Sequence, residues 1–159
     1  MQKPLTRELL AEALGLADKS RMSESETRAA GKVLDPVTLA VLKGRLEQIA
    51  DEMDATLYRS AFNPIIAEAR DACHGLYHAE TGDTLVQGTK GLPIFVGAMS
   101  FAVRSVIARV ARDGGVDPDD VFLFNDPYDG GTHLNDFRLV RPVFRDGRLF
   151  CWLASVGLW

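Results

Sequence analysis

Two long stretches with helical periodicity constrain the fold of this chain most strongly. The first begins at Asp35-Pro36, an N-cap residue followed by proline in the first helical position, and is predicted to run to about Ser60. Asn63-Pro64 then stops it. The second is predicted from about Val96 to Arg112, with Asp113-Gly-Gly115 as its C-terminal stop.

Both helices are expected to be amphipathic and to pack on a core. The apolar side of the first carries Val37, Ala40, Val41, Leu42, Leu46, Ile49, Met53 and Leu57, and that of the second carries Phe95, Met99, Val103, Val106, Ile107 and Val110. The opposite face of the first helix is acidic, with Glu47, Asp51, Glu52 and Asp54.

Short strands separated by turn signals are predicted around these helices. Cys73–Tyr77 and Thr84–Gln87 flank the turn at 80–83 and favour a β-hairpin. The apolar run Val121–Phe124 predicts a buried strand. Phe137–Phe144 alternates in part, and its Pro142 indicates an edge or a bulge.

A second hairpin is predicted at Asp146-Gly147, which leads into Arg148–Val156. Together these elements predict an α+β fold, with two long amphipathic helices packed on a mainly antiparallel sheet.

The chain is expected to divide near residue 33. Residues 7–18 suit a short helix and 19–31 are polar and serine-rich, so residues 1–32 are interpreted as a helical appendage and linker. Residues 33–159 are the predicted core. The apolar ending Leu149–Trp159 favours an incomplete fragment of a larger domain, whose exposed sheet edge would promote self-association.

Composition excludes several classes of protein. Apolar residues make up 47% and charged residues 25% of the 159, as in globular domains. The net charge of −4 and the scattered basic residues argue against nucleic-acid binding. No apolar run reaches the ~20 residues of a membrane span, and no signal peptide is evident. Two isolated cysteines, Cys73 and Cys151, favour the reducing cytoplasm.

The segment Asn125–Asp136 has the side chains best suited to chemistry, and it directly follows the predicted strand at 121–124. His133 and Asp136 can each bind a divalent cation, and Asp126 or Asp129 can add a further ligand. The alternative is a plain surface turn, because Asn, Asp, Pro and Gly are ordinary turn formers. Spacing alone does not decide between them.

Two other histidines, His74 and His78, share one face of the first predicted hairpin. On an extended strand their separation is too large for both to bind one ion.

Three segments resemble the hydantoinase B/oxoprolinase family: Asp35-Pro-Val-Thr-Leu39, Tyr58-Arg-Ser-Ala-Phe62 and the block Asn125–Asp136. Their order and separation resemble the beginning of that family's large subunit, over residues 33–159. Full members are several times longer. The family includes B subunits of ATP-dependent hydantoinases, the corresponding half of 5-oxoprolinase, and a related subunit of acetone and acetophenone carboxylases.

The resemblance implies a hydrolase subunit that opens the C–N bond of a cyclic amide such as a hydantoin or oxoproline ring. It also implies a hydantoinase A-type partner that uses ATP, and a hetero-oligomer in the full-length protein. The partner would phosphorylate the carbonyl oxygen, because an unactivated lactam is a poor electrophile. The B-type subunit would then complete ring opening.

The resemblance also implies roles for particular residues. In the carboxylase branch the metal ligands of this block correspond to His133 and Asp136, for manganese, zinc or iron. A third ligand, a histidine just after the final strand, corresponds to Leu158, which cannot coordinate a cation. His133 can instead act as a general base without metal. Asp126 would orient the loop or add a ligand.

Two other functions remain open. One is an acetone- or acetophenone-carboxylase-like subunit that needs ATP, bicarbonate and a divalent metal, against which Leu158 counts. The other is a non-catalytic truncated remnant or assembly fragment, which Leu158 and the apolar C-terminus favour.

Overall fold

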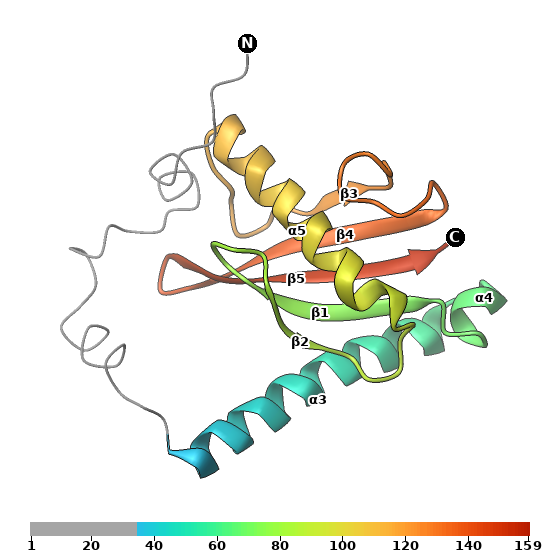
Figure 1. The fold of residues 1–159 in the computed structure, drawn as a ribbon, viewed down its shortest axis with the longest axis horizontal. Coiled ribbons are helices and arrows are strands. Elements are labelled where there is room, and N and C mark those ends of the chain that lie inside the picture. Colours follow the sequence, from blue (N-terminus) through green and yellow to red (C-terminus); the bar gives the residue numbers. More distant parts are fainter. Residues whose placement is uncertain (1–34) are drawn as a thin grey trace.

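A computed structural model describes residues 35–159 as a five-stranded antiparallel sheet with a long helix on each face (Figure 1). The predicted appendage at 1–32 lies outside the described residues. The elements in chain order are α3 (Pro36–Ser60), α4 (Pro64–Ala67), β1 (Ala72–His78), β2 (Thr84–Gln87), α5 (Ile94–Asp113), β3 (Phe122–Phe124), β4 (Asp136–Arg145) and β5 (Arg148–Leu158). The strand order is β2-β1-β5-β4-β3. The predicted α+β class is confirmed.

Helix α3 begins where the sequence predicts. The Asp35 carboxylate accepts hydrogen bonds from the backbone N–H groups of Val37 and Thr38, each at 3.0 Å, and Pro36 occupies the first turn. The helix ends at Ser60, just before Asn63 caps the short α4.

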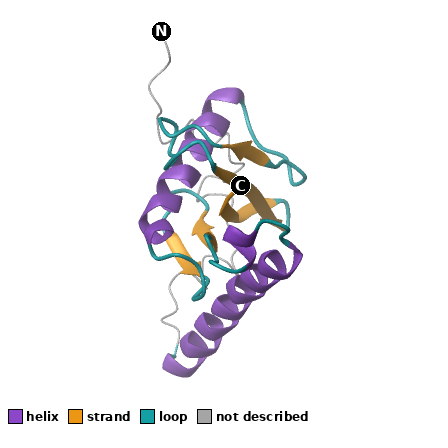
Figure 2. Cartoon of the chain, turned by 90° about the vertical axis from the view of Figure 1, so that its right-hand side faces the viewer, coloured by secondary structure: helices purple, strands orange, loops and turns teal. Residues whose placement is uncertain are grey.

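The predicted faces of α3 are wrong in two respects. Val37 and Val41 of the predicted apolar side are 72% and 58% exposed. Asp54 of the predicted acidic face is fully buried. The reason is that only the C-terminal half of α3 lies against the sheet, over β1 and β2, while its first turns extend beyond the sheet (Figure 2).

Helix α5 covers the other face of the sheet and forms most of the core. Alternate residues of β1 divide between the faces, so that Cys73 and Tyr77 pack with α5, whereas Leu76 packs with Ala50 of α3. By length and composition alone, α5 is long and apolar enough to cross a membrane. Its apolar side covers the sheet, as in the core helix of a globular domain.

The last strand lies in the centre of the sheet, and not at an edge as the sequence led us to expect. β5 pairs with β1 on one side and with β4 on the other. The exposed edges among the described residues are β2 and β3. Alternation of apolar and polar residues indicates which side chains of a strand face the core, but it does not indicate which strands lie beside it. The predicted edge position of β5 was wrong for this reason.

The predicted turn at Asp146-Gly147 is confirmed, because both residues have positive φ, at 52° and 74°, as a type I′ hairpin requires. Pro142 lies beyond the three β4 residues that pair with β3, next to an irregularity at Val143, so the missing N–H breaks no ladder bond there. β3 itself is a half-buried edge strand rather than the buried strand predicted.

Candidate functional site

The loop between β3 and β4 is closed by its own polar side chains. The Asn125 side-chain amide donates to the carbonyl oxygen of Leu134 at 2.7 Å. The Asp126 carboxylate accepts from the N–H of Tyr128 at 2.9 Å, which forms an Asx turn. Asp126 is exposed and its carboxylate bonds within the loop, to Tyr128, so its geometry favours shaping of the loop, one of the two roles predicted for it.

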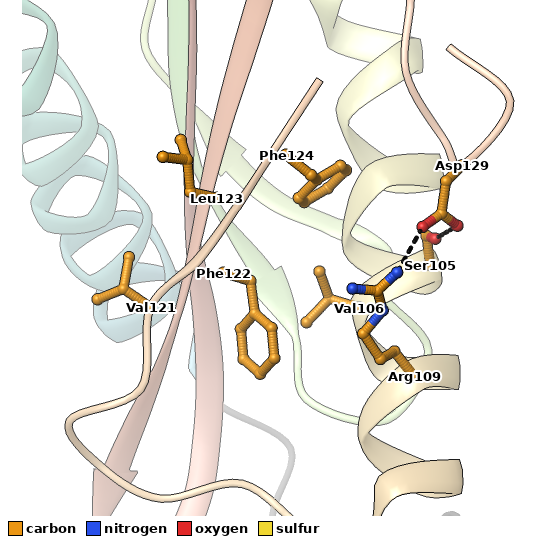
Figure 3. Close-up of a pocket in the computed structure, with 8 residues that line it drawn as sticks. All are labelled: Ser105, Val106, Arg109, Val121, Phe122, Leu123, Phe124 and Asp129. Carbon is orange, nitrogen blue, oxygen red and sulfur yellow. Dashed lines mark hydrogen bonds and ion pairs between the residues drawn. The ribbon is translucent and has the colours of Figure 1, made fainter. Parts of the chain in front are cut away.

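Asp129 fastens this loop to α5. Its carboxylate accepts a hydrogen bond from the Ser105 hydroxyl and forms an ion pair with Arg109 at 3.3 Å, as Figure 3 shows. A pocket of about 240 Å³ lies beside this contact, lined by α5 and by residues 121–124. Because its oxygens are engaged with α5, Asp129 is an anchor rather than the extra metal ligand suggested by the sequence.

Two glycines allow the loop to approach its surroundings closely. Gly130 has φ +79°, and a Cβ there would lie 2.8 Å from the carbonyl oxygen of Phe101 on α5. A Cβ at Gly131 would clash with the backbone of Asp126. The loop can therefore take this shape without strain only with glycine at both positions.

His133 and Asp136 come together at the end of the loop. The Nδ1 atom of His133 lies 3.5 Å from Oδ2 of Asp136. The imidazole is 57% exposed, whereas Asp136 is only 1% exposed at the start of β4. The pair therefore joins a solvent-accessible imidazole to a buried carboxylate.

Asp136 is held by a buried polar network. The Thr132 hydroxyl donates to Asp136 Oδ2, and Arg138 donates to the Thr132 oxygen at 2.5 Å. The Arg138 guanidinium is fully buried and lies 3.8 Å from the carboxylate. Burial lowers the pKa of Arg138, and the charge of Asp136 opposes this. One oxygen of Asp136, Oδ1, is buried without a partner among the described residues.

Asp71 is a third member of the site, which sequence analysis did not single out. Burial raises the pKa of its carboxyl, the nearby charge of Asp136 raises it further, and His133 lowers it. Asp71 directly precedes β1, the other neighbour of β5, and this brings it to the same end of the sheet. Its position next to a strand start is the signal that could have identified it.

Leu158 also lies at this end of the sheet. It is paired with Asp136 in the β4–β5 register, and its N–H donates to the carbonyl oxygen of Asp71 at 3.1 Å. The position of the histidine expected from the resemblance is thus part of the site, but it carries a hydrocarbon side chain.

These residues do not form a metal centre by themselves. Within residues 35–159 no group of three or more His, Cys, Asp or Glu side chains is arranged to hold a metal ion. The unpartnered Oδ1 of Asp136 would suit a cation, but its Oδ2 is already bonded to Thr132 and lies near Arg138. Leu158 has no donor atom in its side chain, so the third ligand expected from the resemblance is missing. The described residues therefore do not fit the predicted metal.

The other two histidines lie apart from this site. His78 is exposed and bonded to Thr81, whereas His74 is buried and paired with Asp54. They form no shared metal site among the described residues.

Comparison with known proteins identifies relatives of this chain. Residues 35–159 match the family described as hydantoinase B/oxoprolinase. The chain is 33% identical to 5-oxoprolinase 1 of Arabidopsis thaliana over 133 residues, which are 84% of this chain and 10% of that protein. It is 31% identical to caprolactamase subunit beta of Pseudomonas jessenii over 124 residues, which are 78% of this chain and 21% of that protein.

A solved structure shares the fold. It is the nucleotide-free structure of acetone carboxylase, an enzyme of ATP-dependent acetone carboxylation. The two structures superpose with a TM-score of 0.72 at 30% sequence identity, over 84% of this chain and 19% of that one. The chain spans between 9% and 22% of the length of the curated relatives that it matches. The match across all described residues shows that the chain belongs to the hydantoinase B/oxoprolinase family.

Proposed function

We propose that this chain is part of an ATP-dependent enzyme that hydrolyses a cyclic amide and that its loop at 125–136 contributes to ring opening. The observation that carries the proposal is the pairing of exposed His133 with buried Asp136 on a loop fixed to α5. Support comes from family membership and from the names of two relatives, a 5-oxoprolinase and a caprolactamase, both of which denote enzymes acting on lactams.

His133 is the general base in this proposal. Asp136 faces Nδ1 and orients the imidazole, which leaves Nε2 to take a proton from a water molecule. That water attacks the activated carbonyl carbon of the ring. Collapse of the adduct breaks the C–N bond while His133 returns the proton to the leaving ring nitrogen, and a second water then hydrolyses the acyl phosphate that remains and releases phosphate. The separation of 3.5 Å is longer than a hydrogen bond, as catalytic contacts often are before substrate binds.

Arg138 and Thr132 act on Asp136 rather than on substrate. A buried carboxylate needs compensation, and the guanidinium and the hydroxyl supply it. They hold the Asp136 carboxyl group in place opposite the imidazole, so that it can stabilise the imidazolium formed when His133 takes the proton. Asp71 adds a second carboxylate to the same end of the sheet.

The proposal includes a partner. An A-type subunit would use ATP to phosphorylate the lactam oxygen and would form a hetero-oligomer with this one. The word subunit in the name of the caprolactamase relative supports such an assembly. We also assign the protein to the cytoplasm, in keeping with the free thiols of Cys73 and Cys151.

The test measures product with the protein bound to a co-expressed A-type subunit and supplied with ATP. We expect 5-oxoproline, hydantoin or caprolactam to stimulate ADP release together with a ring-opened product. ADP release and carboxylation with acetone and bicarbonate, but not with lactams, would instead support the second candidate. The structural similarity to acetone carboxylase favours that candidate, and Leu158 counts against it. Turnover of neither substrate class would contradict both.

A further inference from the structure

Asp54 and His74 form a buried pair on the α3 side of the sheet, on the opposite face from Asp136 and Arg138. Nδ1 of His74 lies 2.6 Å from Oδ1 of Asp54, and the two side chains are 4% and 0% exposed. Gly88 packs so closely on the carboxylate that any Cβ there would clash with it. The backbone therefore fits tightly around this pair.

The second ring nitrogen of His74 is free to bind a ligand. Because Nδ1 faces a carboxylate, that nitrogen carries a proton, and Nε2 is the ring nitrogen left to meet a ligand. Nε2 has no hydrogen-bond partner among the described residues, and the ring lines a groove of about 450 Å³ between α3 and the sheet. The groove is lined by Ile49, Glu52, Met53, Thr56, Leu57, Ser60, His74 and Ser155.

Most polar atoms in this groove can only accept hydrogen bonds. The Thr56 and Ser60 hydroxyls already donate to helix carbonyls, at 2.7 and 2.8 Å, so their oxygens offer lone pairs to a ligand. Glu52 adds a carboxylate, and no lysine or arginine lines the groove. Asp54 places a further negative charge under His74, and its Oδ2 has no partner in the described part of the chain.

We propose that this groove is a binding site for a small primary ammonium ion with an apolar chain. The ammonium group donates to Nε2 of His74 and to neighbouring oxygens, while Glu52 and Asp54 supply the opposite charge. The chain of the ligand lies against Met53 and Leu57 of α3. Anions are disfavoured, since the lining includes the carboxylate of Glu52 and has no lysine or arginine.

The experiment uses the 159-residue protein and n-butylammonium as the probe, followed by NMR of the histidine side-chain nitrogens. Titration to about 50 mM exceeds the millimolar Kd expected for a ligand with so few heavy atoms. We expect a saturable shift of the His74 Nε2 signal with butylammonium, and neither n-butanol nor butyrate should reproduce it. No shift, or an equal shift with butanol or butyrate, would overturn the proposal.

Removal of His74 risks unfolding, so the variant that decides is Glu52→Gln on the exposed side of α3, with Glu47→Gln as its control. Glu47 is on the same helix but does not line the groove. Glu52→Gln should weaken butylammonium binding roughly two- to five-fold, the loss typical of a solvent-accessible charge pair. Equal affinities for both variants would contradict the site. Binding is measured without turnover, so the result is independent of the proposed ring-opening activity.

Discussion

Asp136 is paired with Leu158 across β4 and β5, so the aliphatic side chain belongs to a site otherwise built from His133, Asp136 and Asp71. In the resemblance to the carboxylase branch this position carries a histidine. The pairing explains why the residues of this chain do not complete a metal centre although two of the expected ligands stand next to each other.

Leu158→His is predicted to create metal binding. An imidazole here would join His133, Asp136 and Asp71 at the same end of the sheet and supply the missing nitrogen donor. Elemental analysis after dialysis against manganese or zinc should show about one ion per chain in the variant, as a donor set of this kind implies. Leu158→Phe, which adds a ring without nitrogen, should match the unmodified chain. Equal metal content in both variants would contradict the position of residue 158 beside His133 and Asp136.

Arg138→Met is predicted to destabilise the fold. The substitution leaves the Asp136 carboxylate buried beside an uncharged side chain, which typically costs about 3–5 kcal/mol. Urea unfolding gives the free energy of unfolding. Adding Asp136→Asn should recover part of the loss, because the unpaired charge is then gone. A double variant as unstable as the sum of the two singles would show that the residues are not coupled.

Gly130→Ala is predicted to cost more stability than Gly147→Ala. Both glycines have positive φ, so each alanine pays about 1–2 kcal/mol for the left-handed conformation. At Gly147 nothing lies within 4 Å of the added Cβ, whereas at Gly130 it meets the Phe101 carbonyl oxygen at 2.8 Å. Thermal unfolding of the two variants measures the difference. Equal losses would mean that the loop does not pack on α5 as described.

The two buried thiols, Cys73 and Cys151, are predicted to lower the free energy of unfolding at alkaline pH. Burial raises the pKa of Cys73 to about 12 and that of Cys151 to about 11, from an ordinary value of 9.0. The unfolded chain releases these protons first, so the contribution of the thiols to the free energy of unfolding should be constant below the ordinary value and should fall as pH rises through 9 towards 11.

Urea unfolding between pH 8 and about 10.5 measures this slope, since the effect appears only above the ordinary thiol pKa. Cys151→Ala should flatten the curve in part. Unchanged slopes in Cys151→Ala and Cys73→Ala would contradict the assignment to the thiols.

Local signals in the sequence predicted the elements well. The cap at Asp35, the stop at Asp113-Gly-Gly115 and the turn at Asp146-Gly147 are decided by short-range backbone chemistry, and the structure has all of them. The family block at 125–136 likewise singled out His133 and Asp136, which lie 3.5 Å apart in the structure.

Tertiary arrangement was not predictable from the same signals. Helical periodicity treats Asp54 as a solvated charge, and only the position of His74 on β1 explains its burial. Asp71 joins the site because β1 and β4 both flank β5, a strand order that alternation does not encode. The prediction that β5 forms an edge of the sheet was wrong for the same reason.

The most direct test of the central claim compares His133→Ala with His78→Ala in the ATP-dependent complex with an A-type subunit. His78 is an exposed histidine bonded to Thr81, away from the loop, and is the matched control. Loss of a general base should lower ring opening of the preferred lactam by roughly 10²–10⁴-fold in His133→Ala, and His78→Ala should remain near the unmodified rate. Equal turnover by both variants would contradict a role for His133 in the reaction.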